Sequence, residues 1–437
     1  MTKYYKNAAS RKKHTRGTYM NTSKILTSIL KLANEKITSN AFQEKHRIGK
    51  AFSRTRSLSF SNLMYFVLQS THKSISINYA QLIENLSPST LPFVSKQAIS
   101  KARQGVSSEA FKELFRLSVE QFYKHFTNLS DWHGFHIYAV DGSTIQIPES
   151  KENSDIWGSN PNQTGKESPL ASVSILYDVL NDLLVDVSLH PYRYSERTSA
   201  KEHIEFLPKF QNTVVLFNRG YPSEDLFRFL DSQNVYFLMR LPKSYKKAIF
   251  EDEDSLFTYP ASCKKKQLTL RSIHFPLENG KTEYLVTNIM KNKMDYSVFK
   301  ELYCLRWGIE SKYRELKNRL EIEAFNSIKP ICIYQEFFAA MFLSNIAALL
   351  KKEADSSISV SSDNKYIYKA NRSYILNRIK SRIVQLLSYS VSDCKRIIYK
   401  IIEEASKVLS IIRPGRKYGR YRKHTRRKYY NHMKNCI

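Results

Sequence analysis

The spacing of apolar residues divides the chain into three regions. From about residue 57 to 126, and again after residue 330, apolar residues recur every three to four positions, which predicts amphipathic helices. From about residue 135 the apolar runs are short and are bounded by turn residues, which predicts strands. Helix-like stretches near 199–210 and at 223–232 are interspersed with these strands. We therefore predict an α/β core flanked by N-terminal and C-terminal helical regions.

The predicted core strands are joined by short connections. Residues 135–148 have the pattern of a strand, a turn and a second extended run, and residues 171–191 that of a hairpin with its turn at Asn181–Asp182. Residues 241–284 contain charged blocks and then the alternating stretch "QLTLRSIHF", which predicts a β-rich insertion into the core. The other predicted strands are "VVLF" (214–217), "VYFLMRL" (235–241) and "YLVTNI" (284–289).

The charge of the chain indicates its partner. Lys and Arg number 69 and Asp and Glu number 40, so the formal net charge is +29. Such a surface attracts nucleic acid, an anionic membrane surface or an acidic protein. Basic residues are spread along the chain and are also concentrated at 1–16 and 413–430, and the second of these segments has no acid. We interpret the partner as nucleic acid and the ends as interaction tails.

The sequence gives no sign of membrane insertion or secretion. The N-terminus is polar and basic, unlike a secretory signal. The longest apolar stretch, 337–350, contains Ser344 and Asn345 and is too short to span a bilayer, so we predict a buried helix. The five cysteines include no close pair with metal-ligand spacing, which argues against a zinc module. We expect a soluble intracellular protein.

A short helix after Ser95 has two interpretations. Ser95 is a plausible N-cap, and the helix carries Lys96, Gln97, Lys101 and Arg103. Polar and basic residues in the first turns of a helix are suited to a major groove. The alternative is a solvated face of a helical bundle.

A long helix is predicted from about Ser297 to Leu320, with Asp295 or Ser297 as its cap. Tyr303, Arg306, Glu310 and Lys317 fall on one stripe at about 100° per residue, and Arg314 falls there too. Trp307 lies on another side, and we predict that it belongs to the core. A second, apolar stripe is predicted to pack on the sheet; it consists of Leu302, Leu305, Ile309, Leu316 and Leu320.

The polar stripe also has two interpretations. It has the spacing of salt bridges on a solvated helix face. Alternatively, one acid flanked by a phenol and cations, opposite a strand that carries its own acid, Asp141, is suited to phosphodiester chemistry. A tyrosine on a solvated face is unusual, and we favour the second interpretation.

The chain resembles the DDE transposases of bacterial insertion sequences, in the subgroup with a β-rich insertion in a ribonuclease-H-like core. The spacing Tyr-x2-Arg-x3-Glu-x6-Lys at 303–317 matches that family's helical signature. "YAVDGSTIQIP" is similar to its first acidic motif, with Asp141 on the first core strand. "LFNRGY" is similar to its second motif, except that Asn218 stands where the family has an aspartate. The resemblance covers roughly residues 135–350.

The resemblance implies an organisation and an activity. The expected domains are an N-terminal helical DNA-binding region with a basic arm (1–130), a ribonuclease-H-like catalytic core (131–352, with the insertion at about 241–284) and a C-terminal helical region with a basic tail (353–437). The implied activity is Mg²⁺-dependent DNA cleavage and strand transfer by a transposase of an insertion sequence, with Mn²⁺ as a substitute. The implied partner is double-stranded DNA, bound by a homodimer in the bacterial cytoplasm at the nucleoid. The alternative is a catalytically inactive, transposase-derived DNA-binding protein that acts as a repressor or inhibitor.

The resemblance also implies roles for individual residues. Asp141 and Glu310 would hold the metal, and Asn218 would occupy the third catalytic position. Asparagine offers one oxygen but no charge, so the activity is in doubt. Asp178, on a neighbouring strand, is the best candidate to substitute, whereas Asp225 is predicted to face elsewhere. The DNA contacts would come from Tyr303, Arg306, Arg314 and Lys317.

Overall fold

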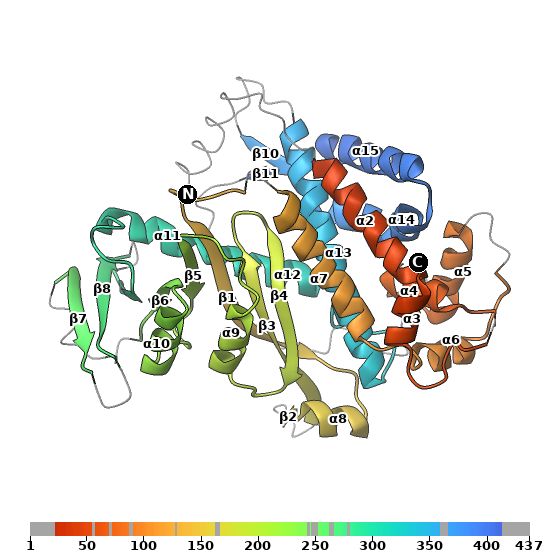
Figure 1. Cartoon of the computed structure of the whole chain (residues 1–437), viewed down its shortest axis with the longest axis horizontal. Coiled ribbons are helices and arrows are strands. Elements are labelled where there is room, and N and C mark those ends of the chain that lie inside the picture. Colours follow the sequence, from red (N-terminus) through yellow and green to blue (C-terminus); the bar gives the residue numbers. More distant parts are fainter. Residues whose placement is uncertain are drawn as a thin grey trace. The chain divides into compact units, whose positions relative to one another are not determined.

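The computed structural model describes residues 22–54, 57–69, 72–86, 91–126, 129–161, 167–242, 245, 252–261, 266–277, 280–358 and 366–412. The chain forms two compact units (Figure 1). One unit comprises Asn128–Thr144 and Ser172–Tyr313, and we call it the sheet unit. The other comprises Met1–Thr127, Ile145–Ala171 and Arg314–Ile437, and we call it the helical unit. The basic segments predicted at 1–16 and 413–430 lie outside the described residues.

The central sheet has the strand order β4-β3-β1-β5-β6-β9-β8-β7. Strand β1 is parallel to β5, and β5 is parallel to β6. Strands β1 and β3 are antiparallel, since Val179 N donates to Ile137 O and Ile147 N donates to Pro169 O. Strands β4, β3 and β1 lie side by side, and β1 is followed by the parallel strands β5 and β6, while the short strand β2 pairs with the start of β3. This is a ribonuclease-H-like topology, which confirms the predicted fold class. The strand bounds are β1 His136–Gln146, β3 Glu167–Asp178, β4 Leu183–Pro191, β5 Thr213–Phe217 and β6 Tyr236–Arg240.

One prediction about this sheet is wrong and one is confirmed. Residues 136–146 form one continuous strand, whereas we predicted a strand, a turn and a second run. The hairpin of β3 and β4 turns at Asn181–Asp182 as predicted, and Asp182 adopts a positive φ of 59°. Asp178 stabilises this turn, because its carboxylate accepts hydrogen bonds from the backbone N–H groups of Leu180 and Asn181.

Strands of the predicted insertion extend the same sheet. The predicted core strand after the insertion is β9 (Thr282–Thr287), which is antiparallel to β6. The insertion itself contains β8 (Leu268–Pro276), antiparallel to β9, and β7 (Asp254–Tyr259), antiparallel to β8. Arg271 on β8 is buried and donates to both carboxylate oxygens of Asp254 at 2.7 and 2.8 Å. This pair fixes the register of the two outer strands.

Two helices of the sheet unit, α9 and α10, begin at serine caps. Ser195 and Ser223 accept hydrogen bonds from the backbone at the starts of α9 (Glu196–Ile204) and α10 (Glu224–Ser232). Figure 1 shows these two helices next to each other in front of the sheet. The long helix predicted at 297–320 is instead two helices, α11 (Phe299–Leu305) and α12 (Trp307–Asn318). At the interruption, Arg306 N donates to Tyr303 O and Ile309 N to Arg306 O, which is 3₁₀-type bonding.

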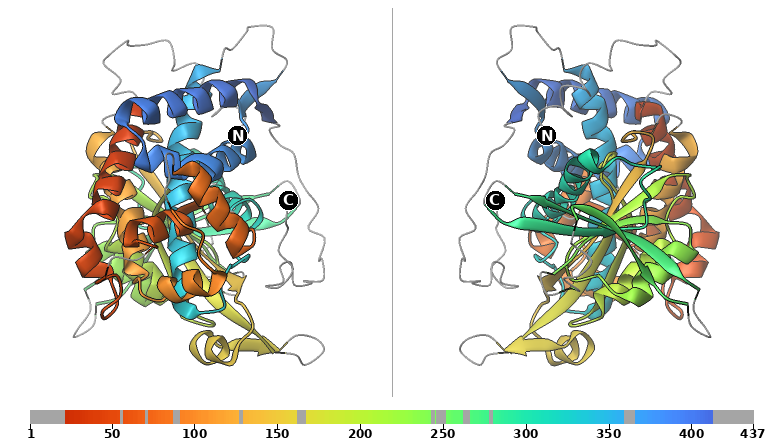
Figure 2. Two further views of the ribbon diagram at one scale, coloured as in Figure 1. Left: turned by 90° about the vertical axis from the view of Figure 1, so that its right-hand side faces the viewer. Right: turned by 90° about the vertical axis from the view of Figure 1, so that its left-hand side faces the viewer.

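The helical unit is built around α13 (Pro330–Ser357), as Figure 2 shows. The predicted buried helix is thus confirmed, although it is longer than the apolar stretch 337–350. Its length and apolar composition would be sufficient to cross a membrane, but 94% of its apolar window is buried inside the protein. It packs against helices from both ends of the chain, namely α2 (Thr22–Thr38), α4 (Phe60–Gln69), α7 (Glu109–His125), α14 (Arg372–Ser388) and α15 (Val391–Lys407).

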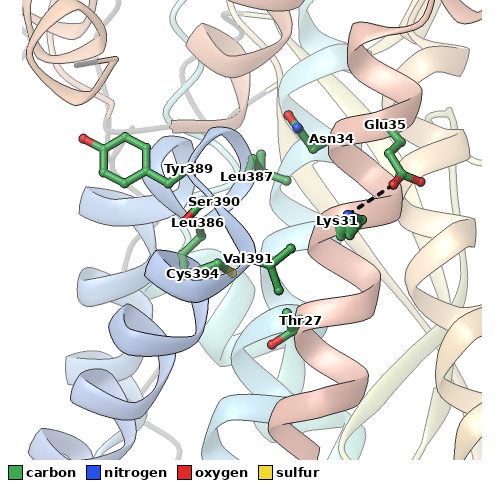
Figure 3. A pocket seen from close by; sticks show the side chains of 10 residues that line it. All are labelled: Thr27, Lys31, Asn34, Glu35, Leu386, Leu387, Tyr389, Ser390, Val391 and Cys394. Carbon is green, nitrogen blue, oxygen red and sulfur yellow. Dashed lines mark ion pairs between the residues drawn. The ribbon is translucent and has the colours of Figure 1, made fainter. Parts of the chain in front are cut away.

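The smaller elements of the helical unit complete its surface. A cavity of about 230 Å³ lies between α2 and the α14–α15 connection, and the ion pair of Lys31 and Glu35 is among its lining residues (Figure 3). None of the predicted site residues lines it.

The remaining elements of the helical unit are α3 (Asn40–His46), α5 (Ile75–Asn85), α6 (Lys96–Arg103), α8 (Lys151–Trp157), β2 (Ser159–Pro161) and the antiparallel pair β10 (Ile367–Ala370) and β11 (Leu409–Ile412).

Helix α6 is the helix considered above for a major groove. Ser95 caps it as predicted, accepting from Ala98 N, and Lys96, Gln97 and Lys101 are exposed. The prediction is wrong for Arg103, which is 1% exposed and pairs with Glu336 of α13 at 2.8 Å. Arg103 therefore joins α6 to the core of the helical unit and does not contribute to a DNA-facing surface.

Breaking this buried pair is expected to destabilise the protein. Glu336→Gln leaves the Arg103 charge buried without its counter-charge, so we expect the free energy of unfolding to fall by about 3–5 kcal/mol. Urea denaturation followed by circular dichroism measures this change. Glu109→Gln is the matched control, because Glu109 is 58% exposed and 3.8 Å from Lys112, and it is expected to cost less than about 1 kcal/mol. Equal effects of the two substitutions would contradict this assignment.

Candidate active site

Asp141 lies where β1 extends past the end of β5. The parallel register pairs Ala139 with Leu216, so two residues further on Asp141 stands beside Asn218, the residue after β5. Asp141 Oδ1 accepts hydrogen bonds from Asn218 Nδ2 at 2.7 Å and from Gly142 N at 3.0 Å. The first two predicted catalytic positions are therefore in direct contact.

Asn218 is held by the loop that follows it. Its Oδ1 accepts a hydrogen bond from Gly220 N at 2.7 Å, which leaves Nδ2 directed at Asp141. Arg197, at the start of α9, donates to the carbonyl oxygens of Gly220, Tyr221 and Pro222. Both the side chain of Asn218 and the loop after it are thus fixed by hydrogen bonds.

Arg306 brings Glu310 to the same place. Its guanidinium lies 3.7 Å from Asp141 Oδ2 and donates to Glu310 Oε1 at 3.0 Å. Its side chain is 5% exposed, whereas that of Glu310 is 32% exposed. The carboxylates of Asp141 and Glu310 therefore both lie at the buried guanidinium of Arg306, although they come from a strand and a helix far apart in sequence.

The aromatic neighbours of Arg306 differ from expectation. Tyr303 is buried, and its hydroxyl donates to Phe217 O, the carbonyl directly before Asn218, at 3.4 Å. The prediction that Trp307 belongs to the core is wrong, because it is 41% exposed. Trp307 lies about 200° around the helix from the buried Ile309, and the Arg306 guanidinium lies 5.1 Å from the centroid of its ring.

Tyr313 is a site residue that sequence reasoning missed. It is buried, and its hydroxyl lies within hydrogen-bond distance of Asp141 O at 2.8 Å and Val173 O at 3.1 Å. This contact holds α12 against β1 and β3 at the level of Asp141. The signal was its spacing, since residues three apart on a helix share a face, and Tyr313 follows Glu310 by three.

Asp141 is buried among charged groups of both signs. Burial raises the pKa of Asp141 to about 6, against the opposing effects of Arg306 and the Gly142 N–H, and the negative charges of Glu196 and Glu310 raise it further. Glu196, the first residue of α9, is a second residue that sequence reasoning missed. The signal for it was weak: Gly142 and Gly220 each follow a site position closely and leave room beside the backbone.

The other acids considered lie elsewhere. Asp178 is engaged by the β3–β4 turn, and its two carboxylate oxygens also accept from Asn181 Nδ2 at 3.1 and 2.9 Å. It is therefore poorly placed to substitute for the missing acid. Asp225 faces away as predicted and pairs with Lys201.

Arg314 and Lys317 belong to the helical unit, since the boundary between the units falls within α12. Arg314 is exposed, and Lys317 is half-buried. Burial lowers the pKa of Lys317, while the nearby Glu323 opposes the shift.

The residues present fit a hard divalent cation in their chemistry. Within the described residues no group of three or more His, Cys, Asp and Glu side chains forms a ready-made metal site. The donors around Arg306 are nevertheless the carboxylates of Asp141 and Glu310, and carboxylate oxygens are ligands that Mg²⁺ prefers. Burial is the main cause of the raised pKa of Asp141, and the negative charges of Glu196 and Glu310 add to it. Asp141 and Glu310 are the residues that would hold such an ion.

The core of the chain matches a known family. Residues 132–346 match the transposase DDE domain, a range that includes Asp141, Asn218 and Glu310. Over 280 residues the chain is 26% identical to the transposase InsG for insertion sequence element IS4 of Escherichia coli (strain K12), covering 59% of this chain and 62% of that protein. Over 162 residues it is 26% identical to the putative transposase InsZ of the same organism, covering 36% of this chain and 54% of that protein. The matches thus span little more than half the length of these relatives.

A solved structure is also similar. It is the piggyBac transposase in a synaptic complex with hairpin DNA, determined by cryo-electron microscopy. The superposition covers 90% of this chain and 87% of that chain, with a TM-score of 0.46 and 10% sequence identity.

Proposed function

We propose that this chain is a DNA transposase that cleaves and transfers phosphodiester bonds. The match of residues 132–346 to the transposase DDE domain supports the proposal. The observation that carries the proposal is the convergence of Asp141 and Glu310 on Arg306, beside Asn218. A strand acid and a helix acid that meet near the end of β5 offer the carboxylate oxygens that this chemistry needs.

The proposed roles of the residues follow from their contacts. Asp141 and Glu310 hold Mg²⁺, or Mn²⁺ in its place, which when bound activates the attacking oxygen and stabilises the leaving oxygen. Arg306, with its Nε lacking a hydrogen-bond partner among the described residues, neutralises phosphate oxygens next to the cleaved bond. Tyr303 and Tyr313 keep the helix in register with β5 and β1 through backbone carbonyls. Arg314 and Lys317 contact DNA further along α12.

The proposed partner is double-stranded DNA, both as element ends and as target. Transposition joins two ends to one target, so we propose a homodimer on DNA, acting in the cytoplasm at the nucleoid. The net charge of +29 supports DNA as the partner.

The test is cleavage of a DNA fragment that carries the coding region with both of its flanks, in Mg²⁺ and in Mn²⁺. The chain as it stands and the Asn218→Asp variant are compared side by side. Absence of cutting by both proteins, with DNA binding intact, would remove the proposal.

Asn218 favours a second candidate function. With an amide at the third catalytic position, the protein would keep DNA binding and act as a repressor or inhibitor of transposition. Cutting by Asn218→Asp alone, with equal DNA affinity of both proteins, would support this function. Strong cutting by the original chain would exclude it.

Deleting residues 413–437 is expected to reduce the dependence of DNA affinity on salt. This segment has nine Lys or Arg at 413–430 and no acid there, and each phosphate contact contributes about 0.9 to the slope of log K against log salt. Loss of three contacts would lower the slope by about 3. Fluorescence anisotropy with a labelled duplex at several salt concentrations measures it. An unchanged slope would show that the tail does not bind phosphates.

A further inference from the structure

The carboxylate of Glu196 lies between the two backbone segments that carry Asp141 and Asn218. A Cβ atom added to Gly142 would lie 2.8 Å from Glu196 Oε1. A Cβ atom added to Gly220 would lie 3.2 Å from Glu196 Oε2 and 3.2 Å from Asn218 Oδ1. A residue with a side chain at either of these two positions would thus occupy space that the Glu196 carboxylate uses.

Helix α9 is anchored so that Glu196 stays in this position. At its first turn Arg197 donates to three carbonyl oxygens of the loop after Asn218. Near its last turn His203 bridges Asp186 Oδ2 at 2.7 Å and Ser174 Oγ at 2.9 Å. His203 is 0% exposed, so this Ser–His–Asp arrangement has no access for a substrate and acts as an anchor between α9 and strands β3 and β4.

The simplest structural role does not account for Glu196. An acid in the first turn stabilises a helix through its dipole, and Glu196 meets that description. That role requires no glycine on the facing strand or loop. Among the described residues the Glu196 carboxylate has neither an ion pair nor a hydrogen bond, although Lys201 and Arg197 lie on the same helix and bond elsewhere.

Tyr221, in the loop after Asn218, is a second buried group in this part of the chain. It is 0% exposed, and its hydroxyl has no hydrogen-bond partner among the described residues. Burial is the main cause of the raised pKa of Tyr221, and the charges of Glu196 and Asp141 raise it further. An unpaired buried hydroxyl is suited to a water molecule or an oxygen bound to a cation.

We propose that Glu196 supplies the third carboxylate of the cation site, in place of the acid that position 218 lacks. The inference rests on the proposed function, because it assumes that Asp141 and Glu310 hold a divalent cation. Asn218 then positions Asp141 and offers at most one amide oxygen, while Glu196 restores the negative charge of the site.

The inference is tested by measuring how tightly the full chain binds Mn²⁺ without DNA. The electron paramagnetic resonance signal of free Mn²⁺ gives the bound fraction. Glu196→Gln is expected to weaken Mn²⁺ binding at least about tenfold, since loss of one charged ligand removes both a bond and a charge. Gly142→Ala is expected to weaken it as well, because the new methyl group displaces the carboxylate without removing it. Glu205→Gln, an exposed acid at the other end of α9, is the matched control and is expected to change binding less than twofold.

The outcomes separate this inference from the proposed function. Weaker binding in Asp141→Asn, with unchanged binding in Glu196→Gln, overturns the role of Glu196 and leaves the proposed function intact. Binding that responds to neither substitution overturns both. Thermal unfolding of each variant without Mn²⁺ shows whether a loss of Mn²⁺ binding reflects misfolding. Because Glu196 is exposed, we expect the unfolding midpoint of Glu196→Gln to equal that of the original chain.

Discussion

Asp141→Asn is expected to reduce Mg²⁺-dependent DNA cleavage at least about a thousandfold while DNA affinity stays within about twofold. Asp141 is the only acid in direct contact with both Asn218 and Arg306 within the described residues, at 2.7 and 3.7 Å. The substitution preserves shape and removes the charge around which the site is arranged. The measurement is the rate of strand cleavage under single-turnover conditions, with the variant and the original chain at equal DNA occupancy.

Asp225→Asn is the matched control for this loss. It makes the same chemical change in the sheet unit at a side chain that is 80% exposed and pairs with Lys201. We expect it to leave cleavage unchanged. Retention of cleavage by Asp141→Asn would contradict the assignment of Asp141, and loss of DNA binding with it would show that the site is structural.

Asn218→Asp is expected to raise cleavage by about ten- to a hundredfold and to make folding stability depend on divalent cations. In the original chain Asn218 Nδ2 donates to Asp141 Oδ1. An aspartate would place two carboxylates in contact, which we expect to lower the free energy of unfolding by about 1–3 kcal/mol without a cation. A cation at a hundred times its dissociation constant would restore about 2.7 kcal/mol.

Urea denaturation with and without Mn²⁺ measures the stability effect, and cleavage of the flanked coding fragment measures the activity. The cation should stabilise Asn218→Asp more than the original chain. Asn218→Ser serves as control, since it removes the hydrogen bond from Nδ2 without adding a charge. Equal stabilisation of all three proteins by Mn²⁺ would show that residue 218 does not face the cation.

The two predictions bear on each other through Glu196. If Glu196 completes the site, the original chain binds Mn²⁺ and cleaves weakly, and Asn218→Asp strengthens both. If it does not, Mn²⁺ binding by the original chain is independent of Glu196, and a gain in binding comes only from residue 218. Comparing Glu196→Gln in the original chain with Glu196→Gln in the Asn218→Asp background distinguishes these cases, because only in the first case does the loss of Glu196 weaken Mn²⁺ binding by the original chain.

Local pattern was sufficient for the elements and for the motif. The strand "VVLF", the cap at Ser95 and the turn at Asn181–Asp182 depend on neighbours within a few residues, so the sequence predicted them correctly. The sequence did not predict the parallel register that places Asp141 beside Asn218, but both residues lie in motifs that the sequence made recognisable.

Long-range packing decided the rest. Arg103 has the same local context as an exposed helix residue, and only Glu336, more than two hundred positions away, makes it a buried partner. Trp307 is exposed beside the Arg306 guanidinium, whereas its size and apolar character alone favoured the core.

By itself, the sequence determined the α/β core and the helical flanks, because short-range periodicity encodes them, and its resemblance to a known family singled out Asp141, Asn218 and Glu310 as candidates. Only the tertiary structure placed Arg306 between two acids and Glu196 between two glycines. Those contacts join a strand, two loops and two helices, and the chain positions they bring together carry no shared pattern. The arrangement of charged groups around Asp141 therefore depends on the tertiary structure and not on local sequence.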